Sequence, residues 1–177
     1  GPSWNNQQLI HTYSAVPSNV KDFFETGVNT SHNVSISGLS NDEKVSYYLS
    51  SGYNYDDGIM PSNKETYSRN TLAFRGSYKA TDWLKISSTV NLSTSEANTV
   101  STYQGTSPID GIYEFPRDLT LVDRKDLSNA FKTPEAWFPP YGITNPYWSI
   151  ENNYNRSSSK QIFGKVQVDV KPIKQLT

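Results

Sequence analysis

Hydrophobic and polar residues alternate along several stretches of this chain. The clearest stretch is Lys44–Ile59, "KVSYYLSSGYNYDDGI". Every second residue from Val45 to Tyr55 is apolar, aromatic or serine, whereas the residues between them are small or polar. Successive side chains of a β-strand point to opposite faces. The stretch therefore predicts a strand with one apolar, aromatic face and one small, polar face.

The same alternation recurs and predicts an all-β fold. We expect antiparallel strands near residues 30–38, 44–56, 66–79, 84–96 and 158–171, paired in sequence order, with the pairing across the last long connection left open. One short helix is expected in "PSNVKDFFETG", where Asn19 and Asp22 resemble a capping pair and Gly27 can end the helix. From about Glu96 to Ser157 the alternation stops, and prolines interrupt the chain.

The connections between the expected strands alternate in length. Residues 39–43, 80–83 and 172–175 form short turns, whereas residues 56–65 and 97–157 form long ones. In an up-and-down sheet, all short turns then lie at one rim and all long loops at the other. Outer-membrane barrels show this asymmetry. The patterns alone leave open two architectures, namely part of a large transmembrane β-barrel and a soluble β-sandwich.

Composition narrows the class of protein. The chain has 177 residues, 13% of them aromatic, which is not typical of a disordered chain. Its net charge of -1 gives no basic field that would attract nucleic acid, and the absence of Cys excludes disulfides and thiolate metal sites. No apolar run approaches the roughly 20 residues of a membrane helix. The start, "GPSW", lacks Met and a signal peptide, so we expect a processed chain or a piece of a longer one.

The sequence offers no convincing catalytic constellation, and we expect neither enzyme activity, nor a metal, nor a cofactor. His11 and His32 are far apart in sequence. The segment Tyr55–Gly58 could hold calcium, but a turn is the better interpretation. "LVDRKDL" is read as a solvated loop. A glycosidase would need two facing carboxylates, and none can be paired from the sequence.

The long loop carries a cluster of aromatic residues. Flat aromatic faces can stack on sugar rings, so we treat these residues as candidates for contact with a ligand or a partner. The plainer alternative, which we favour, is that the rings and prolines fold the loop on itself or against a partner. The candidates are Tyr103, Tyr113, Trp137, Phe138, Tyr141, Tyr147 and Trp148. Trp83, beside a short turn, is expected in an aromatic girdle at a membrane interface.

Several blocks together resemble one family. "NVKDFFETG", "NVSISG" and "VSYYLSSGYNYDDGIMPS", followed by "ATDWLKISSTVNLS" and "NPYWSIENNYN", are similar in content and order to SusC/RagA-family TonB-dependent outer-membrane transporters. The resemblance covers nearly the whole chain. The sequence shows no signal peptide, TonB box or plug. Its five expected strands are too few for a closed barrel of this kind. The chain therefore resembles an internal fragment of such a transporter.

The resemblance implies a location and partners. It implies import of oligosaccharides or peptides across a bacterial outer membrane, with a SusD-like surface lipoprotein as lid, TonB as energy source and lipid around the barrel. Residues 1–28 would connect plug to barrel, 29–97 and 158–177 would form barrel strands, and 98–157 would form a long extracellular loop. The apolar face would meet lipid, and the polar face would line the lumen. The residues expected to face the lumen are Arg69, Arg75, Asn91 and Lys165.

Overall fold

The structure, a computed structural model, describes residues 13–103, 107–128 and 144–171. These residues form two compact units. The sheet unit comprises residues 26–100 and the described residues from 154 onward. The loop unit comprises residues 13–25 and the described residues between 101 and 153. Each unit is described separately below.

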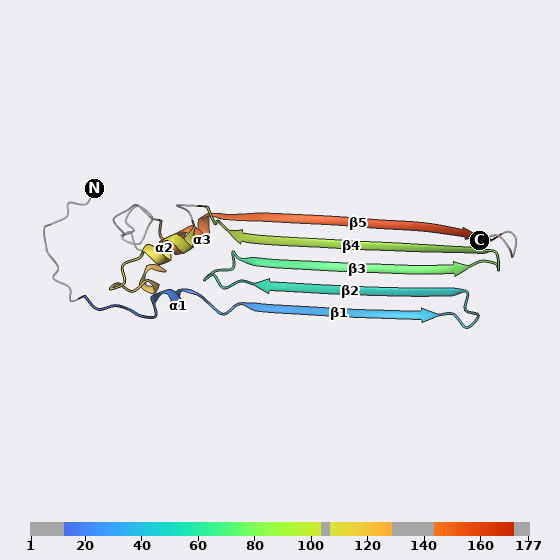
Figure 1. Cartoon of the computed structure of the whole chain (residues 1–177), viewed down its shortest axis with the longest axis horizontal. Helices are drawn as coiled ribbons and strands as arrows, with labels where there is room; N and C mark the ends of the chain where they lie inside the picture. Colours follow the sequence, from blue (N-terminus) through green and yellow to red (C-terminus); the bar gives the residue numbers. More distant parts are fainter. Residues whose placement is uncertain (1–12, 104–106, 129–143, 172–177) are drawn as a thin grey trace. The chain divides into compact units, whose positions relative to one another are not determined.

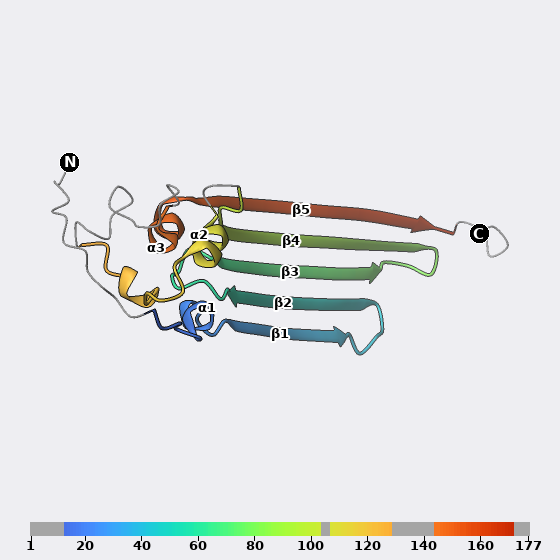
Figure 2. The same cartoon turned by 60° about the vertical axis from the view of Figure 1, so that its left-hand side comes forward.

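The sheet unit is one antiparallel sheet whose strands follow the sequence order (Figures 1 and 2). The strands are β1 (Val28–Leu39), β2 (Val45–Asp57), β3 (Thr66–Lys79), β4 (Leu84–Val100) and β5 (Tyr154–Val170). This confirms the prediction of five antiparallel strands and extends most of them by a few residues. It also settles the open pairing, because β4 and β5 pair with each other although the long loop separates them in sequence.

Two short turns join these strands at one end of the sheet. Between β1 and β2, Glu43 adopts a left-handed conformation with φ 54°, and its backbone N–H donates to the carbonyl of Ser40 at 2.8 Å. The Ser40 hydroxyl also donates to Asp42, and this bond, with a second from the Lys44 N–H, lowers the pKa of Asp42. Between β3 and β4, Lys79 and Asp82 form an ion pair at 2.7 Å. We call this end of the sheet the short-turn end.

The strand register aligns the apolar residues of all five strands on one side of the sheet. Ile36 lies opposite Leu49, Leu49 opposite Phe74, and Phe74 opposite Val90. Because side chains alternate along each strand, the register defines an apolar face and a polar face. The apolar face consists of Val34, Ile36, Val45, Tyr47, Leu49, Tyr53, Leu72, Phe74, Tyr78, Leu84, Ile86, Val90, Leu92, Ile162, Val166, Val168 and Val170.

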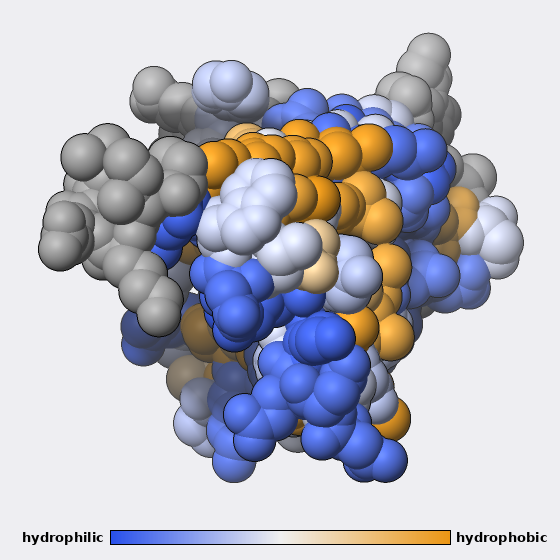
Figure 3. All heavy atoms as spheres, turned by 90° about the vertical axis from the view of Figure 1, so that its right-hand side faces the viewer, coloured by the Kyte–Doolittle hydropathy of each residue, from blue (hydrophilic) through white to orange (hydrophobic). Residues whose placement is uncertain are grey.

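Much of the apolar face is exposed. Val34, Ile162 and Val166 are 73%, 74% and 72% exposed, and most other members are also open to solvent. In Figure 3, which looks toward the short-turn end, hydrophobic residues gather in one band instead of being scattered among hydrophilic ones. Within the described part of the chain, all strands belong to a single sheet, and no second sheet covers this face. The five strands form an open sheet with β1 and β5 at its edges.

The segment after β4 corrects the expectation of a single short helix. It contains α2 (Pro108–Glu114), the short 3-10 helix η1 (Val122–Arg124) and α3 (Pro146–Asn152), in addition to the expected α1 (Asn19–Phe23) near the start of the chain (Figure 1). Among the described residues, the buried apolar side chains lie almost entirely in this loop unit. Its core, and not the sheet, resembles the interior of a small soluble domain.

Candidate ligand-facing loop unit

Helix α1 is positioned by one asparagine side chain. Asn19 lies inside the helix and does not cap it, so the predicted capping pair with Asp22 is wrong. Its amide group instead reaches the long loop, donating to the Leu119 carbonyl at 2.6 Å and accepting from the Leu121 N–H at 2.8 Å. The helix ends at Phe23, before Gly27, because the chain becomes extended at Phe24. Asn19 thus joins two segments about one hundred residues apart in sequence.

Helices α2 and α3 begin in the same way. Each has a proline at the start and a capping side chain just before it. The Ser107 hydroxyl accepts from the Ile109 N–H at 3.3 Å, and the Asn145 side-chain carbonyl accepts from the Tyr147 N–H at 3.0 Å. Proline suits the first helical turn because the N–H groups there have no partner within the helix. The Ser-Pro and Asn-Pro pairs were therefore signals that could have predicted both helices.

The core of the loop unit joins α1 to α3. The rings of Phe23 and Tyr147 lie 4.7 Å apart at a tilted angle, and both side chains are almost fully buried. Asn145 is fully buried and donates to the Arg124 carbonyl at 3.1 Å. The remaining buried hydrophobic side chains of this unit are Ile112, Phe115, Leu121 and Ile150. Burial of this apolar surface stabilises the loop unit.

The residues that precede β1 complete this unit. The Val16 N–H donates to the Arg117 carbonyl at 2.8 Å, and Lys125 forms an ion pair with Glu25 at 3.1 Å. The same segment then enters β1 at Val28, which pairs with Asp57 at the end of the sheet opposite the short turns. Residues 13–25 and the described part of the long loop therefore form one compact unit.

The structure separates the aromatic candidates into two groups. Tyr103 and Tyr113 are 75% and 72% exposed, whereas Tyr147 is 4% exposed and packs in the core. Trp148 is half-buried. Trp137, Phe138 and Tyr141 lie outside the described residues. Tyr103 and Tyr113 therefore offer accessible ring faces, and Tyr147 serves packing.

Burial also changes the chemistry of Tyr147. Removal of its phenol from water, together with the nearby negative charge of Glu25, raises the pKa of Tyr147 to about 12. The neutral phenol is therefore the form that suits the folded loop unit.

An open cleft lies beside Tyr113. Its volume is about 300 Å³, and it lies between the chain around Val16 and the residues of α2. Ile112 and Phe115 supply apolar lining, and Arg117 and Tyr113 also line the cleft. The lining of this cleft is polar and apolar in about equal parts. Apolar walls combined with a few polar groups and one exposed ring are features of small-molecule sites.

The residues expected to face a lumen share the polar face of the sheet. Arg75 and Lys165 both pair with Thr89, so they lie in one row across β3, β4 and β5. Asn91 lies two residues further along β4, on the same face. Arg69 donates from Nε to the Ser93 hydroxyl at 3.1 Å, and the Arg75 guanidinium lies 5.7 Å from the Tyr48 ring centre. The register therefore brings all four residues to one surface.

The remaining motifs carry no site in the described residues. Asp56 and Asp57 lie at the end of β2 and not in a turn, and Asp56 accepts from the Asn29 amide at 2.6 Å. No group of three His, Asp or Glu side chains in the described residues could hold a metal ion. No helix in that part of the chain is long and apolar enough to cross a membrane. Comparison of the chain with protein-family models gave no match, and comparison with curated proteins gave none either.

Proposed function

We propose that the sheet unit is part of the wall of a bacterial outer-membrane β-barrel, and that the barrel belongs to a TonB-dependent importer. The observation that carries this proposal is the exposed apolar face. From Leu84 to Leu92 on β4, and over the residues paired with them on the other strands, no charged side chain lies on that face. Large exposed apolar patches are rare on soluble monomers.

Charged residues on this side of the sheet are confined to the end away from the short turns. Four charged side chains point to the same side of the sheet as the apolar face, namely those of Asp57, Glu96, Arg156 and Lys160. All four lie beyond the row of Leu92, toward the end with the long connections. Arg156 and Glu96 are close enough for an ion pair at 3.4 Å. A boundary between a charge-free zone and a charged zone at one level of the sheet is what a bilayer surface requires.

The dimensions of the apolar face suit a bilayer. Leu84–Leu92 spans nine residues, and a membrane-crossing strand needs roughly 9–11. The complete strands have 12 to 17 residues, whereas strands of globular proteins usually have about 3–10. The extra length would carry the strands beyond the membrane at the end that bears the long connections.

Aromatic residues border the apolar zone at both ends. Tyr53, Tyr55 and Tyr154 lie toward the end with the long connections. Tyr78 and Trp83 lie at the short-turn end, where Trp83 is 51% exposed. Two aromatic girdles around an apolar band are typical of outer-membrane barrels.

The edges of the sheet support a larger assembly. β1 and β5 each have one side without a strand partner in the described chain. In lipid, every backbone N–H and C=O needs a partner, so an open edge is costly. Further strands on both sides, closing a barrel, would satisfy these groups.

The importer assignment rests on the family resemblance together with the loop unit. In this proposal the short turns face the periplasm, and the loop unit belongs to the extracellular side. The exposed rings of Tyr103 and Tyr113 and the cleft beside Tyr113 support contact with an oligosaccharide or peptide, or with a SusD-like lipoprotein lid. TonB would act through other parts of the transporter.

A soluble β-sandwich that binds carbohydrate is the second candidate. The apolar face is compatible with a sandwich, because in a sandwich a second sheet packs against such a face. Such a sheet would have to come from outside the described residues, since their five strands form a single sheet.

The test compares two neighbouring substitutions on β4. The complete polypeptide containing these residues is expressed in a Gram-negative host as wild type, Val90→Arg and Asn91→Arg. We expect wild-type protein in the outer-membrane fraction, with the heat-dependent gel mobility of a folded barrel. Arg at a lipid-facing midplane site costs about 2–4 kcal/mol, so Val90→Arg should lower the folded fraction and Asn91→Arg should not. Wild-type protein in the soluble fraction would favour the sandwich.

A further inference from the structure

The polar face of the sheet carries an excess of positive charge. Its cations are Arg69, Arg75, Lys79, Lys85, Lys165 and Lys171, against the carboxylates Asp56 and Asp169 on the same face. The chain as a whole has a net charge of -1. The positive charge of this face is therefore a local arrangement and does not follow from composition.

Among the described residues, Lys79 is the one cation of this set that forms an ion pair, although Asp169 lies opposite Lys85 across β4 and β5. Lys79 is engaged by Asp82 at 2.7 Å, and this bond and the lysine charge lower the pKa of Asp82. Arg75, Lys85, Lys165 and Lys171 form no ion pair within the described part of the chain. Their charge is available to a ligand.

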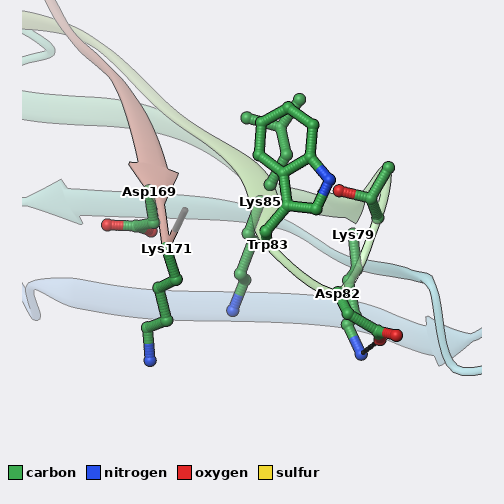
Figure 4. Close-up of a pocket in the computed structure, with 8 residues that line it drawn as sticks. Lys79, Asp82, Trp83, Lys85, Asp169 and Lys171 are labelled. Carbon is green, nitrogen blue, oxygen red and sulfur yellow. Dashed lines mark hydrogen bonds and ion pairs between the residues drawn. The ribbon is translucent and has the colours of Figure 1, made fainter. Parts of the chain in front are cut away.

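The short-turn end shows how the cations are presented. A hollow of about 390 Å³ there is lined by Lys79, Lys85, Lys171 and Trp83, among others. In Figure 4 the three lysine side chains extend to one side, whereas the Trp83 indole lies on the opposite side. The lysines therefore point away from the surface that would meet lipid. This arrangement does not fit lipid headgroups as their partner.

The cations are spread along the strands at three levels. Arg69 lies toward the end with the long connections, Arg75 and Lys165 share a row in the middle, and Lys85 and Lys171 lie at the short-turn end. Arg69 and Lys79 lie ten positions apart on β3, and this corresponds to roughly 33 Å. One phosphate-sized ion cannot contact groups so far apart, but an extended polyanion can.

The surface between the cations carries several small hydroxyl side chains, together with Gln167 and Tyr48. Ser77, Ser87 and Thr89 lie on the polar face between the middle level and the short-turn end. Small side chains leave the longer lysine and arginine chains standing above the surface. Hydroxyl groups can donate to the same carboxylate or sulfate oxygens that the cations attract.

From these observations we infer that the polar face guides an anionic solute, one that carries several carboxylate or sulfate groups along an extended backbone. The inference rests on the proposed function, in which this face borders an aqueous pathway. Charges of one sign along a pathway concentrate counter-charged solutes and favour their passage. An acidic protein segment is the competing occupant, and the experiment distinguishes it.

The test uses the complete polypeptide purified from the outer membrane. The probes are oligogalacturonate, which has a carboxylate on every ring, and its methyl ester, which has the same backbone without charge. The variant Arg75→Gln/Lys165→Gln removes two polar-face charges. The matched control, Arg156→Gln/Lys160→Gln, removes one arginine and one lysine from the opposite side of β5.

We expect the acid to bind more tightly than the ester and to lose affinity as salt is raised. The polar-face variant should weaken binding of the acid by about tenfold while leaving the ester unchanged, since two charge contacts are lost. The control should bind both probes like wild type. Equal affinity for acid and ester, binding of neither, or an equal effect of both variants would overturn the inference.

Two further outcomes are distinguishable. If the polar-face variant bound the acid normally but gave less folded, heat-modifiable protein, the cations would serve an acidic protein segment, and the inference would be wrong. If the polypeptide were not in the outer membrane, the proposed function itself would fail. Failure of the inference alone would appear as a correctly inserted protein that does not distinguish the acid from its ester.

Discussion

At the scale of residues, two side-chain amides hold segments of the loop unit together. Asn19 and Asn145 each use both ends of the amide group, one to accept a backbone N–H and the other to donate to a backbone carbonyl. Both are buried, and a buried amide without partners costs free energy. The Asn-Pro pair marks Asn145 as a possible helix cap, but nothing in the local sequence marks Asn19. The partners of Asn19, and the Arg124 carbonyl that Asn145 binds, come from distant parts of the chain, so these contacts could not be predicted.

Tyr147 gives a prediction at the same scale. Its pKa is about 12 in the folded chain, above the usual value of about 10. A group whose pKa is raised by folding contributes stability that is fully present below its unfolded pKa. That stability is lost as the pH rises toward the folded pKa. The loop unit should therefore lose about 1 kcal/mol between pH 9 and pH 11, through ionisation of this phenol in the unfolded state.

The measurement is denaturant unfolding of the loop unit at both pH values, followed by tryptophan fluorescence. Tyr147→Phe should show a smaller loss between them than wild type, because it has no phenol to ionise. Tyr113→Phe serves as the control, since Tyr113 is 72% exposed. The account of Tyr147 would be contradicted if the two variants showed the same dependence on pH.

At the scale of elements, the strands were predictable from periodicity, whereas the helices of the long loop were marked only by a local signal at their starts. Strict alternation from Val45 to Tyr55 and from Leu84 to Leu92 has one simple structural meaning, and the observed strands follow it. Helices α2 and α3 have only seven residues each. So short a helix shows no clear periodicity, and its stability comes from packing. Only the Ser-Pro and Asn-Pro pairs marked the starts of these helices.

Removal of one helix cap should loosen the loop unit and leave the sheet unchanged. Asn145→Ala deletes the cap of α3 and the bond to the Arg124 carbonyl, at a cost of about 2 kcal/mol. We expect faster amide hydrogen exchange across α3 and normal exchange in β2 and β3. Asn152→Ala is the control, because Asn152 is exposed and bonds only the Trp148 carbonyl in its own helix. Equal exchange in both variants would show that Asn145 does not hold the unit together.

At the scale of the whole molecule, the two faces of the sheet differ in both hydrophobicity and charge. The apolar face is free of charge from Leu84 to Leu92. The polar face carries several cations that form no ion pair with other described residues. The alternation of the sequence predicted two unlike faces. The register, which only the structure gives, shows that these faces are continuous across all five strands. The sequence could not show the association of residues 13–25 with the long loop, because that contact depends on the folded chain.

The central claim is that the apolar face meets lipid, and adjacent residues on β4 test it most directly. The 177 residues contain no Cys, so Val90→Cys and Asn91→Cys can each carry a single NBD fluorophore. The labelled polypeptide is reconstituted in vesicles with nitroxide lipids. We predict that the lipid quenches the label at position 90 and not at position 91. Quenching at neither position would contradict the account, because a label in a sandwich core or on a soluble face would not meet the lipid.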